Sequence, residues 1–168
     1  SCLDGPVGGP ASMTGEGAAR PAARAAGEAA RALDGEAIRF LAALVGVPTP
    51  HPPGDLAEAA ETIAGLIEAE GLAVERIPVP DPFVRQYGIG SITDLLVSVP
   101  IGTASGPTVA LAAPLDTAPA GAGWQTDPYG GAVRAGRIYG RGAADSKGDV
   151  ACYLFALKGL LAAREALP

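Results

Sequence analysis

Two aspartates stand where an α/β protein often carries its site residues. Asp116 follows an apolar segment, residues 108–113, that we expect to be a strand, and Asp145 lies between a glycine-rich turn and the start of a helix. Ligands of open α/β sheets bind in the crevice outside the carboxyl ends of the strands. Asp116 and Asp145 are therefore the candidate site residues. Each also has a purely structural interpretation, Asp145 as a helix N-cap and Asp116 as a turn residue before Pro119.

The glycines before Asp145 raise the question of a nucleotide site. Gly140 and Gly142 could open a dinucleotide-binding turn, but the third glycine of that fingerprint would fall at Asp145, whose charge would repel a pyrophosphate. Lys147 does not follow the glycine spacing of a phosphate-binding P-loop. The sequence therefore argues against a nucleotide site.

Four short motifs follow one another between residues 114 and 148. They read Pro-Leu-Asp-Thr-Ala-Pro over 114–119, Gly-Trp-Gln-Thr-Asp-Pro-Tyr over 123–129, Gly-Arg-Ile-Tyr-Gly-Arg-Gly over 136–142 and Ala-Ala-Asp-Ser-Lys-Gly over 143–148. The series resembles the zinc aminoacylase and carboxypeptidase family, which includes acetylornithine deacetylase, succinyl-diaminopimelate desuccinylase and dipeptidases. In that family the motifs read H-x-D-x-x-P, G-W-x-x-x-P-[FY], G-x-[IL]-[YW]-G-R-G and A-x-D-x-K-G. The likeness runs from about Glu36 to Ala163.

The resemblance implies a chemistry and a role for each aspartate. Asp145 maps onto the carboxylate that bridges two zinc ions, which cobalt can replace, and Asp116 maps onto the catalytic-site aspartate that orients a metal-binding histidine. The implied reaction is hydrolysis of an amide bond in N-acyl amino acids or small peptides, with a glutamate as general base. The implied fold is part of a three-layer zinc-peptidase catalytic domain, an α/β fold with a mostly parallel sheet flanked by helices.

The chain departs from the family pattern at the first zinc ligand. Pro114 stands where the family has histidine, and proline has no lone pair to offer a metal. In the family the glutamate pair, two further ligands and the inserted dimerisation domain come later than the residue matching Pro168. We therefore expect a hydrolase segment truncated before the dimerisation domain, doubtful in zinc binding and inactive as it stands. The alternative is a non-catalytic pseudo-enzyme or gene remnant that keeps a binding or structural role.

Several other residues have ordinary structural interpretations. The one histidine, His51, lies in a proline-rich loop and is expected at the surface. Asp149 suits the dipole of a helix's first turn, and Cys152 is expected as a buried apolar filler on the same helix. Lys147 is expected to be solvated, and packing roles are expected for three aromatic residues, namely Trp124, Tyr129 and Tyr139.

The elements that would position these residues alternate between helix and strand. Asp34 begins a helix that Gly46 and Pro48 end, and Asp55 with Glu58 forms a capping-box signal for a second helix that ends at Gly71. Strands are predicted over residues 72–79, 95–99 and 108–113, the last two as runs covered on both faces. A final helix around residues 150–161 is apolar nearly all round, which indicates a further neighbour and self-association through exposed core surface.

Composition limits the remaining possibilities. The chain has 168 residues, 48% hydrophobic, with a net charge of −6 that disfavours nucleic-acid and membrane partners. Residues 1–33 are rich in Ala, Gly, Arg and Pro and are expected to be a disordered or loosely helical leader, and residues 34–168 to be the hydrolase segment. Two cysteines, Cys2 and Cys152, and the lack of a signal peptide favour the cytoplasm.

Overall fold

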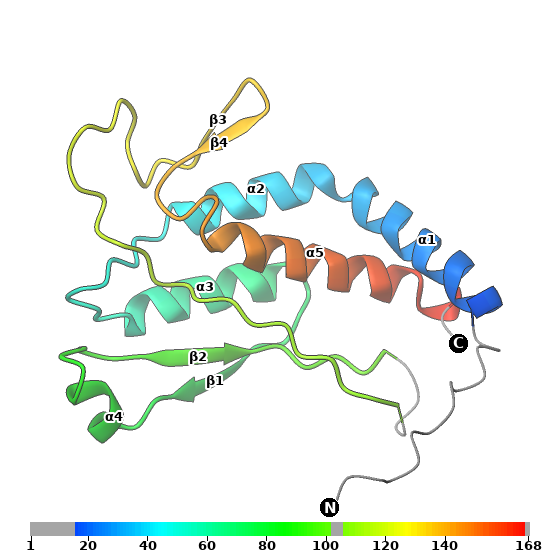
Figure 1. Ribbon diagram of the computed structural model, residues 1–168, viewed down its shortest axis with the longest axis horizontal. Helices are drawn as coiled ribbons and strands as arrows, with labels where there is room; N and C mark the ends of the chain where they lie inside the picture. Colours follow the sequence, from blue (N-terminus) through cyan, green and yellow to red (C-terminus); the bar gives the residue numbers. More distant parts are fainter. Residues whose placement is uncertain (1–15, 102–105, 167–168) are drawn as a thin grey trace, which may run out of the picture.

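The computed structural model of the protein describes residues 16–101 and 106–166. The first two long helices follow one another end to end along one side of the last long helix, and another long helix lies below them (Figure 1). A small antiparallel pair of strands lies lowest in this view, and a hairpin stands at one end. The elements are α1 (Glu16–Ala32), α2 (Asp34–Val45), α3 (Ala57–Ala69), β1 (Glu75–Pro78), α4 (Asp81–Arg85), β2 (Thr93–Leu96), β3 (Ala132–Arg134), β4 (Arg137–Tyr139), α5 (Lys147–Ala162) and the short 3₁₀ helix η1 (Arg164–Ala166).

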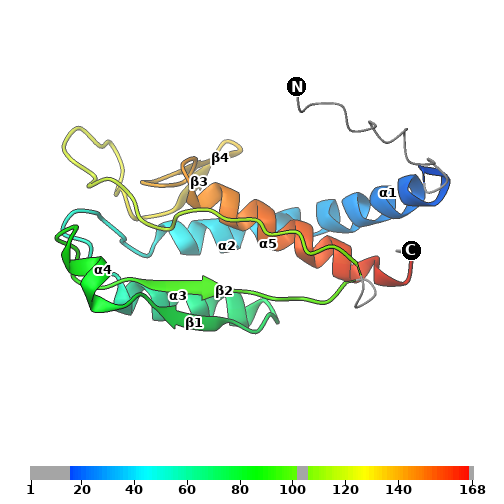
Figure 2. The ribbon, with the colours of Figure 1, turned by 60° about the horizontal axis from the view of Figure 1, so that its bottom comes forward.

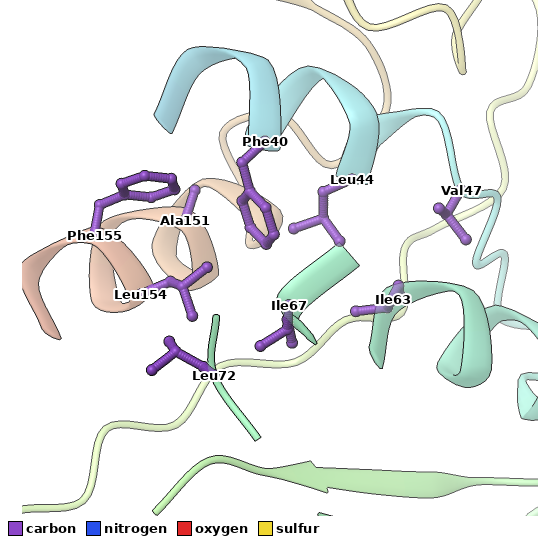
Figure 3. Close-up of a cluster of buried hydrophobic side chains, with 9 residues drawn as sticks. All are labelled: Phe40, Leu44, Val47, Ile63, Ile67, Leu72, Ala151, Leu154 and Phe155. Atoms are coloured by element: carbon purple, nitrogen blue, oxygen red, sulfur yellow. The ribbon is translucent and has the colours of Figure 1, made fainter. Parts of the chain in front are cut away.

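The core lies where α2, α3 and α5 meet. Figure 3 shows the apolar side chains of the three helices pointing toward one another, and the rings of Phe40 and Phe155 meet edge to face with centroids 5.8 Å apart. Such aromatic pairs add to the stability gained from burial alone. The core residues are Phe40, Leu44, Val47, Ile63, Ile67, Leu72, Ala151, Leu154 and Phe155. The three predicted helices are therefore confirmed, and apolar residues from each of them form the core.

The start of α3 differs from its prediction in detail. Leu56 is the N-cap residue and its side chain makes no capping bond, so Asp55 and Glu58 do not form a capping box. Instead the Ser91 hydroxyl accepts the backbone N–H of Ala57 at 3.1 Å and donates to the Asp55 carboxylate. A residue from the next segment of chain thus takes over the capping that the local sequence predicted.

Helix α1 lies within the region that we expected to be a leader. It packs along α5, where Ala22 and Ala26 are buried. The contact depends on Gly159, since a Cβ atom there would lie 2.7 Å from both the Ala26 carbonyl oxygen and the Ala30 Cβ. Residues 1–15 fall outside the described residues, so the predicted division at residue 33 stays a prediction.

The sheet differs from the predicted one. Among the described residues there are two separate two-stranded sheets, both antiparallel: β1 pairs with β2 and β3 with β4. The first predicted strand appears in shortened form as β1. The second appears as β2, which begins two residues earlier than predicted and ends at Leu96, a residue that is exposed rather than covered on both faces. Residues 108–113 belong to no strand. The described part of the chain is thus mixed helix and strand, and the mostly parallel three-layer sheet is not confirmed.

Residues 108–113 form no strand because they lack a partner strand. An apolar run covered on both faces needs a hydrogen-bonded neighbour on at least one edge, whereas residues 108–113 run past the helices without one. Val109 is 80% exposed and Leu111 is 61% exposed. Parallel pairing among the described residues is limited to two isolated bridges, Pro50 with Thr117 and Asp55 with Ser91.

The hairpin β3–β4 follows local rules. Ala135 and Gly136 form its two-residue turn with φ values of +49° and +73°. Two positive φ values are the mark of a type I′ turn, whose twist matches that of the paired strands. No helix of the described ranges is both long and apolar enough to span a bilayer.

Candidate functional site

The segment around Asp116 is held against the proline-rich loop after α2. The backbone N–H of Thr117 donates to the Thr49 carbonyl at 2.8 Å, and the His51 N–H donates to the Thr117 carbonyl at 2.8 Å. The buried Thr49 hydroxyl adds a bond of 2.6 Å to the Leu115 carbonyl. Three hydrogen bonds therefore fix the backbone on both sides of Asp116.

The turn before α5 is fixed against the same segment. The Ser146 hydroxyl donates to the Pro114 carbonyl at 2.7 Å, and the Lys147 N–H closes the turn on the Gly142 carbonyl at 3.1 Å. Gly142 has φ of +83°, and a Cβ atom there would lie 2.7 Å from the Thr117 methyl group. Only glycine combines this backbone conformation with so close an approach. The neighbours of the two aspartates, Pro114 and Ser146, are thus in direct contact.

Lys147 anchors this arrangement to the end of α2. Its side chain is fully buried, and its ammonium donates to the carbonyl oxygens of Leu44 at 3.0 Å and Val47 at 2.6 Å. The Leu44 carbonyl belongs to the last turn of α2 and also accepts the Val47 N–H at 3.2 Å, whereas the Val47 carbonyl lies two residues beyond the helix. Burial lowers the pKa of Lys147 from 10.5 to about 8, because desolvation disfavours the charged form. The expectation of a solvated lysine was wrong.

The two aspartates themselves are exposed. Asp145 lies one residue before Ser146, the N-cap residue of α5, so it is not the cap that the structural interpretation predicted. Asp149 is exposed in the first turn of α5, as expected, but Cys152 is an exposed free thiol rather than a buried filler. The roles assigned to Asp116 and Asp145 by resemblance remain predictions.

The side chains that could ligate a metal do not form a complete metal site. Over residues 16–101 and 106–166 no three His, Cys, Asp or Glu side chains lie close enough together to hold one ion. Pro114 contributes only a carbonyl oxygen, which the Ser146 hydroxyl already engages. A catalytic zinc generally has three protein ligands. The described residues therefore do not fit a zinc pair by themselves.

A pocket opens beside this region, between the loop of residues 120–126 and the β3–β4 hairpin. Trp124, 38% exposed, lies on its wall, and its indole N–H donates to the Ala120 carbonyl at 2.7 Å. Tyr139 and two arginines, Arg134 and Arg141, also line it. The sequence predicted packing roles for Trp124 and Tyr139 and missed both arginines. The alternation of side chains along β3 and β4 could have indicated Arg134, because it places Arg134 and Val133 on opposite faces of the hairpin.

Comparison with known proteins shows which family the chain is similar to. Residues 110–168 match the family model "Peptidase family M20/M25/M40". Proteins named succinyl-diaminopimelate desuccinylase are similar over a longer stretch. The one from Methylobacterium nodulans is 40% identical over 104 residues, which is 61% of this chain and 24% of the relative. The one from Methylobacterium radiotolerans is 35% identical over 133 residues, 77% of this chain and 31% of the relative.

A third relative with the same name, from Methylobacterium sp. (strain 4-46), is 37% identical over 118 residues, 69% of this chain and 27% of the relative. The matches to these three relatives thus span about a quarter to a third of each relative's length. No solved structure matches the chain.

Proposed function

Because the chain belongs to peptidase family M20/M25/M40, we propose that it forms the N-terminal part of the catalytic domain of a metal-dependent hydrolase that cleaves amide bonds. Members of this family are generally metal-dependent and act on small acyl-amino-acid substrates. The observation that carries the proposal is the ordered series of motifs over residues 114–148, whose backbones the structure ties together around Asp116 and Asp145. The cytoplasmic location expected from the sequence remains a prediction.

Asp145 is the metal ligand in this proposal, and zinc is the proposed metal. Its carboxylate is exposed directly before α5, so it is free to share a divalent ion with side chains from elsewhere. Asp116 is a positioning residue for a neighbouring ligand. Since the described residues lack a complete ligand set and a general base, we assign no hydrolytic step to them alone.

The described residues around the turn before α5 hold Asp145 in place. Ser146 and Lys147 fasten the turn to residue 114 and to the end of α2, and Gly142 lets residue 117 approach. A ligand fixed in this way loses little freedom on binding a metal, which is the usual benefit of a rigid site.

The proposed substrate is an N-succinyl or other N-acyl amino acid. The support is the name that the three relatives share, and each of them is at least 35% identical to this chain over the aligned residues. Small peptides, which the family resemblance also implies, are the second substrate class.

A non-catalytic role is the second candidate, and Pro114 favours it. Proline at the position of the family's histidine removes the first metal ligand without disturbing the fold, because only its carbonyl oxygen is used in the structure. A protein of this kind would keep the site as a scaffold for binding.

A chimera distinguishes the two candidates. Residues 34–168 of this chain, with and without Pro114→His, replace the matching segment of the Methylobacterium radiotolerans relative, and hydrolysis of N-succinyl-diaminopimelate is followed with added zinc. The catalytic proposal expects turnover in the Pro114→His chimera and its loss by about two orders of magnitude or more in Asp145→Ala. Asp149→Ala, four residues further along the same chain, is the matched control and should keep the rate.

Two outcomes decide against the catalytic proposal. If Asp145→Ala leaves turnover of the Pro114→His chimera unchanged, Asp145 is not a metal ligand. If the Pro114→His chimera folds but shows no turnover, the segment is not a hydrolase part and the scaffold role stands. Turnover of the chimera that keeps Pro114 would show instead that the histidine position is dispensable.

A further inference from the structure

The pocket beside the site is lined by one loop and one hairpin. It has a volume of about 550 Å³ and is partly open. In Figure 1 the loop arches out from the chain beyond α2 and the β3–β4 hairpin stands next to it. The lining residues are Ala120, Ala122, Gly123, Trp124, Gln125, Thr126, Arg134, Tyr139 and Arg141.

The charge of this pocket is opposite to that of the chain. Two guanidinium groups, of Arg134 and Arg141, line it, and no carboxylate does, although the chain carries a net charge of −6. Ion pairs among the described residues involve Arg24, Arg76, Arg85 and Lys158, and neither pocket arginine is among them. Two unneutralised guanidinium groups in one concave site attract an anion.

Arg141 is held in a fixed orientation. Its Nη2 donates to the carbonyls of Ala120 at 3.2 Å and Pro119 at 3.4 Å, and its guanidinium carbon lies 5.4 Å from the centroid of the Trp124 ring. Its Nε is buried and has no hydrogen-bond partner among the described residues. A buried donor without an acceptor costs free energy, so the arrangement favours an acceptor oxygen from a ligand.

We propose that this pocket binds the carboxylate of a small organic anion, with Arg134 and Arg141 holding the carboxylate and Trp124 and Tyr139 covering the apolar stem. The fork of a guanidinium matches the two oxygens of a carboxylate. The aromatic walls favour an organic anion over inorganic phosphate, which has no apolar part to bury. Identification of this anion with the acyl or amino-acid part of a hydrolase substrate rests on the proposed function, whereas the binding itself does not.

The test uses the full chain and its one tryptophan, Trp124, whose fluorescence reports on this pocket alone. Succinate is the probe, and the matched ligands are succinamide, which keeps the stem without the charge, and inorganic phosphate. We expect a saturable change of emission with succinate, and binding at least about tenfold weaker for succinamide and for phosphate, the loss expected for a missing charge-assisted contact or apolar stem.

Two hairpin arginines provide the matched variants. Arg134 and Arg137 face each other in the β3–β4 register, but only Arg134 lines the pocket. Arg134→Gln should weaken succinate binding about tenfold and Arg137→Gln by less than about twofold. Arg141→Lys, which keeps the charge and loses the fork, should also weaken binding while circular dichroism shows an intact fold.

The proposal is overturned if succinamide binds as well as succinate, if phosphate binds as tightly, or if Arg137→Gln weakens binding as much as Arg134→Gln. The last result would show general attraction of anions to a basic hairpin. None of these measurements needs turnover or a metal. A negative binding result therefore does not contradict the proposed hydrolase function, and a chimera without turnover does not contradict anion binding in the pocket.

Discussion

Lys147 shows how one side chain can connect two distant parts of the chain. Its ammonium reaches the carbonyls of Leu44 and Val47, about one hundred residues earlier, and thereby caps α2 from the start of α5. A charged group in this position is costly because its hydration is lost, and the two carbonyl acceptors offset only part of that cost. The lowered pKa, about 8, expresses the remaining penalty.

The pKa of Lys147 predicts how stability changes with pH. The folded pKa lies below the unfolded value of 10.5, so between pH 8 and 10.5 the unfolded chain binds more protons and stability rises with pH. From pH 7 to 9.5 the unfolding free energy of the natural chain should rise by about 2 kcal/mol relative to Lys147→Met. The measurement is urea unfolding of both proteins across this range, with EDTA present.

Lys147→Met is the reference because every other titrating group is common to both proteins. At pH 7 the variant leaves the Val47 carbonyl without its donor and removes one of two donors from the Leu44 carbonyl, and we expect it to be less stable by about 1–3 kcal/mol. A pH-independent difference between the two proteins would mean that Lys147 keeps its ordinary pKa in the fold.

At the same scale, the sequence predicted the candidate residues better than their surroundings. The motifs located Asp116 and Asp145 in loops that the structure does bring side by side through Pro114 and Ser146. The local sequence could not reveal that Ser146 and Lys147 bond to carbonyl groups, because every residue except proline has the same backbone donor and acceptor and a sequence pattern does not distinguish them. Of the two pocket arginines, the alternation along the hairpin could have indicated Arg134, whereas Arg141 lies beyond β4 and no local pattern indicates it.

At the scale of elements, the contact between α1 and α5 depends on the absence of a side chain. Gly159 is buried on α5 where the backbone of α1 crosses closely, with the Ala26 carbonyl and Ala30 as neighbours. Close approach of two helices is typical of small residues at the contact point. The alanine-rich composition of α1, which suggested a disordered leader, is also what permits this packing.

A pair of alanine substitutions tests this contact. Gly159→Ala should destabilise the protein by about 1–3 kcal/mol, because the added methyl group has no room unless the helices separate. Gly65→Ala is the matched control, since Gly65 lies inside α3 with no atom within 4 Å of the added Cβ, and it should stabilise by up to about 1 kcal/mol through helix propensity. Thermal or urea unfolding measures both.

If Gly159→Ala is as well tolerated as Gly65→Ala, α1 does not pack on α5 in solution and the leader is loose. A shift in proteolytic cleavage toward α1 in the Gly159→Ala protein would give the same information independently, because a detached helix is cut more readily.

Helices were predicted well and strands were not, for a physical reason. The periodicity that predicts α2, α3 and α5 belongs to each helix, and apolar residues of these three helices form the core of Figure 3. A strand exists only with a partner, so residues 108–113 have the composition of a buried strand without becoming one, whereas β1 pairs with β2, the next strand along the chain, across a connection that contains α4. Parallel pairing depends on residues far apart in the chain, which the local pattern does not specify.

At the scale of the whole molecule, the arrangement of metal-ligating side chains predicts weak metal binding. The described residues contain no group of three metal-ligating side chains, and Asp145 is exposed on its own. Isothermal titration at micromolar zinc should therefore show no stoichiometric site, and Asp145→Ala should leave the titration unchanged. One zinc held per chain after dialysis would contradict this, and its loss in His51→Ala would identify His51 as the unrecognised ligand.

The exposed segment of residues 108–113 predicts self-association of the isolated chain. Val109 and Leu111 expose most of their apolar surface, and the backbone beside them has unpaired donors and acceptors, a combination that promotes pairing between chains. Light scattering during size exclusion should give a mass above that of one chain, and Val109→Lys with Leu111→Lys should restore the monomer, because lysine on an open edge opposes pairing. Tyr87→Lys is the matched control: Tyr87 is 73% exposed in the turn after α4, and its replacement should leave the association intact. If the natural chain is a monodisperse monomer that binds no hydrophobic dye, residues 108–113 are covered by the chain itself, and the exposed apolar segment is not a property of the molecule in solution.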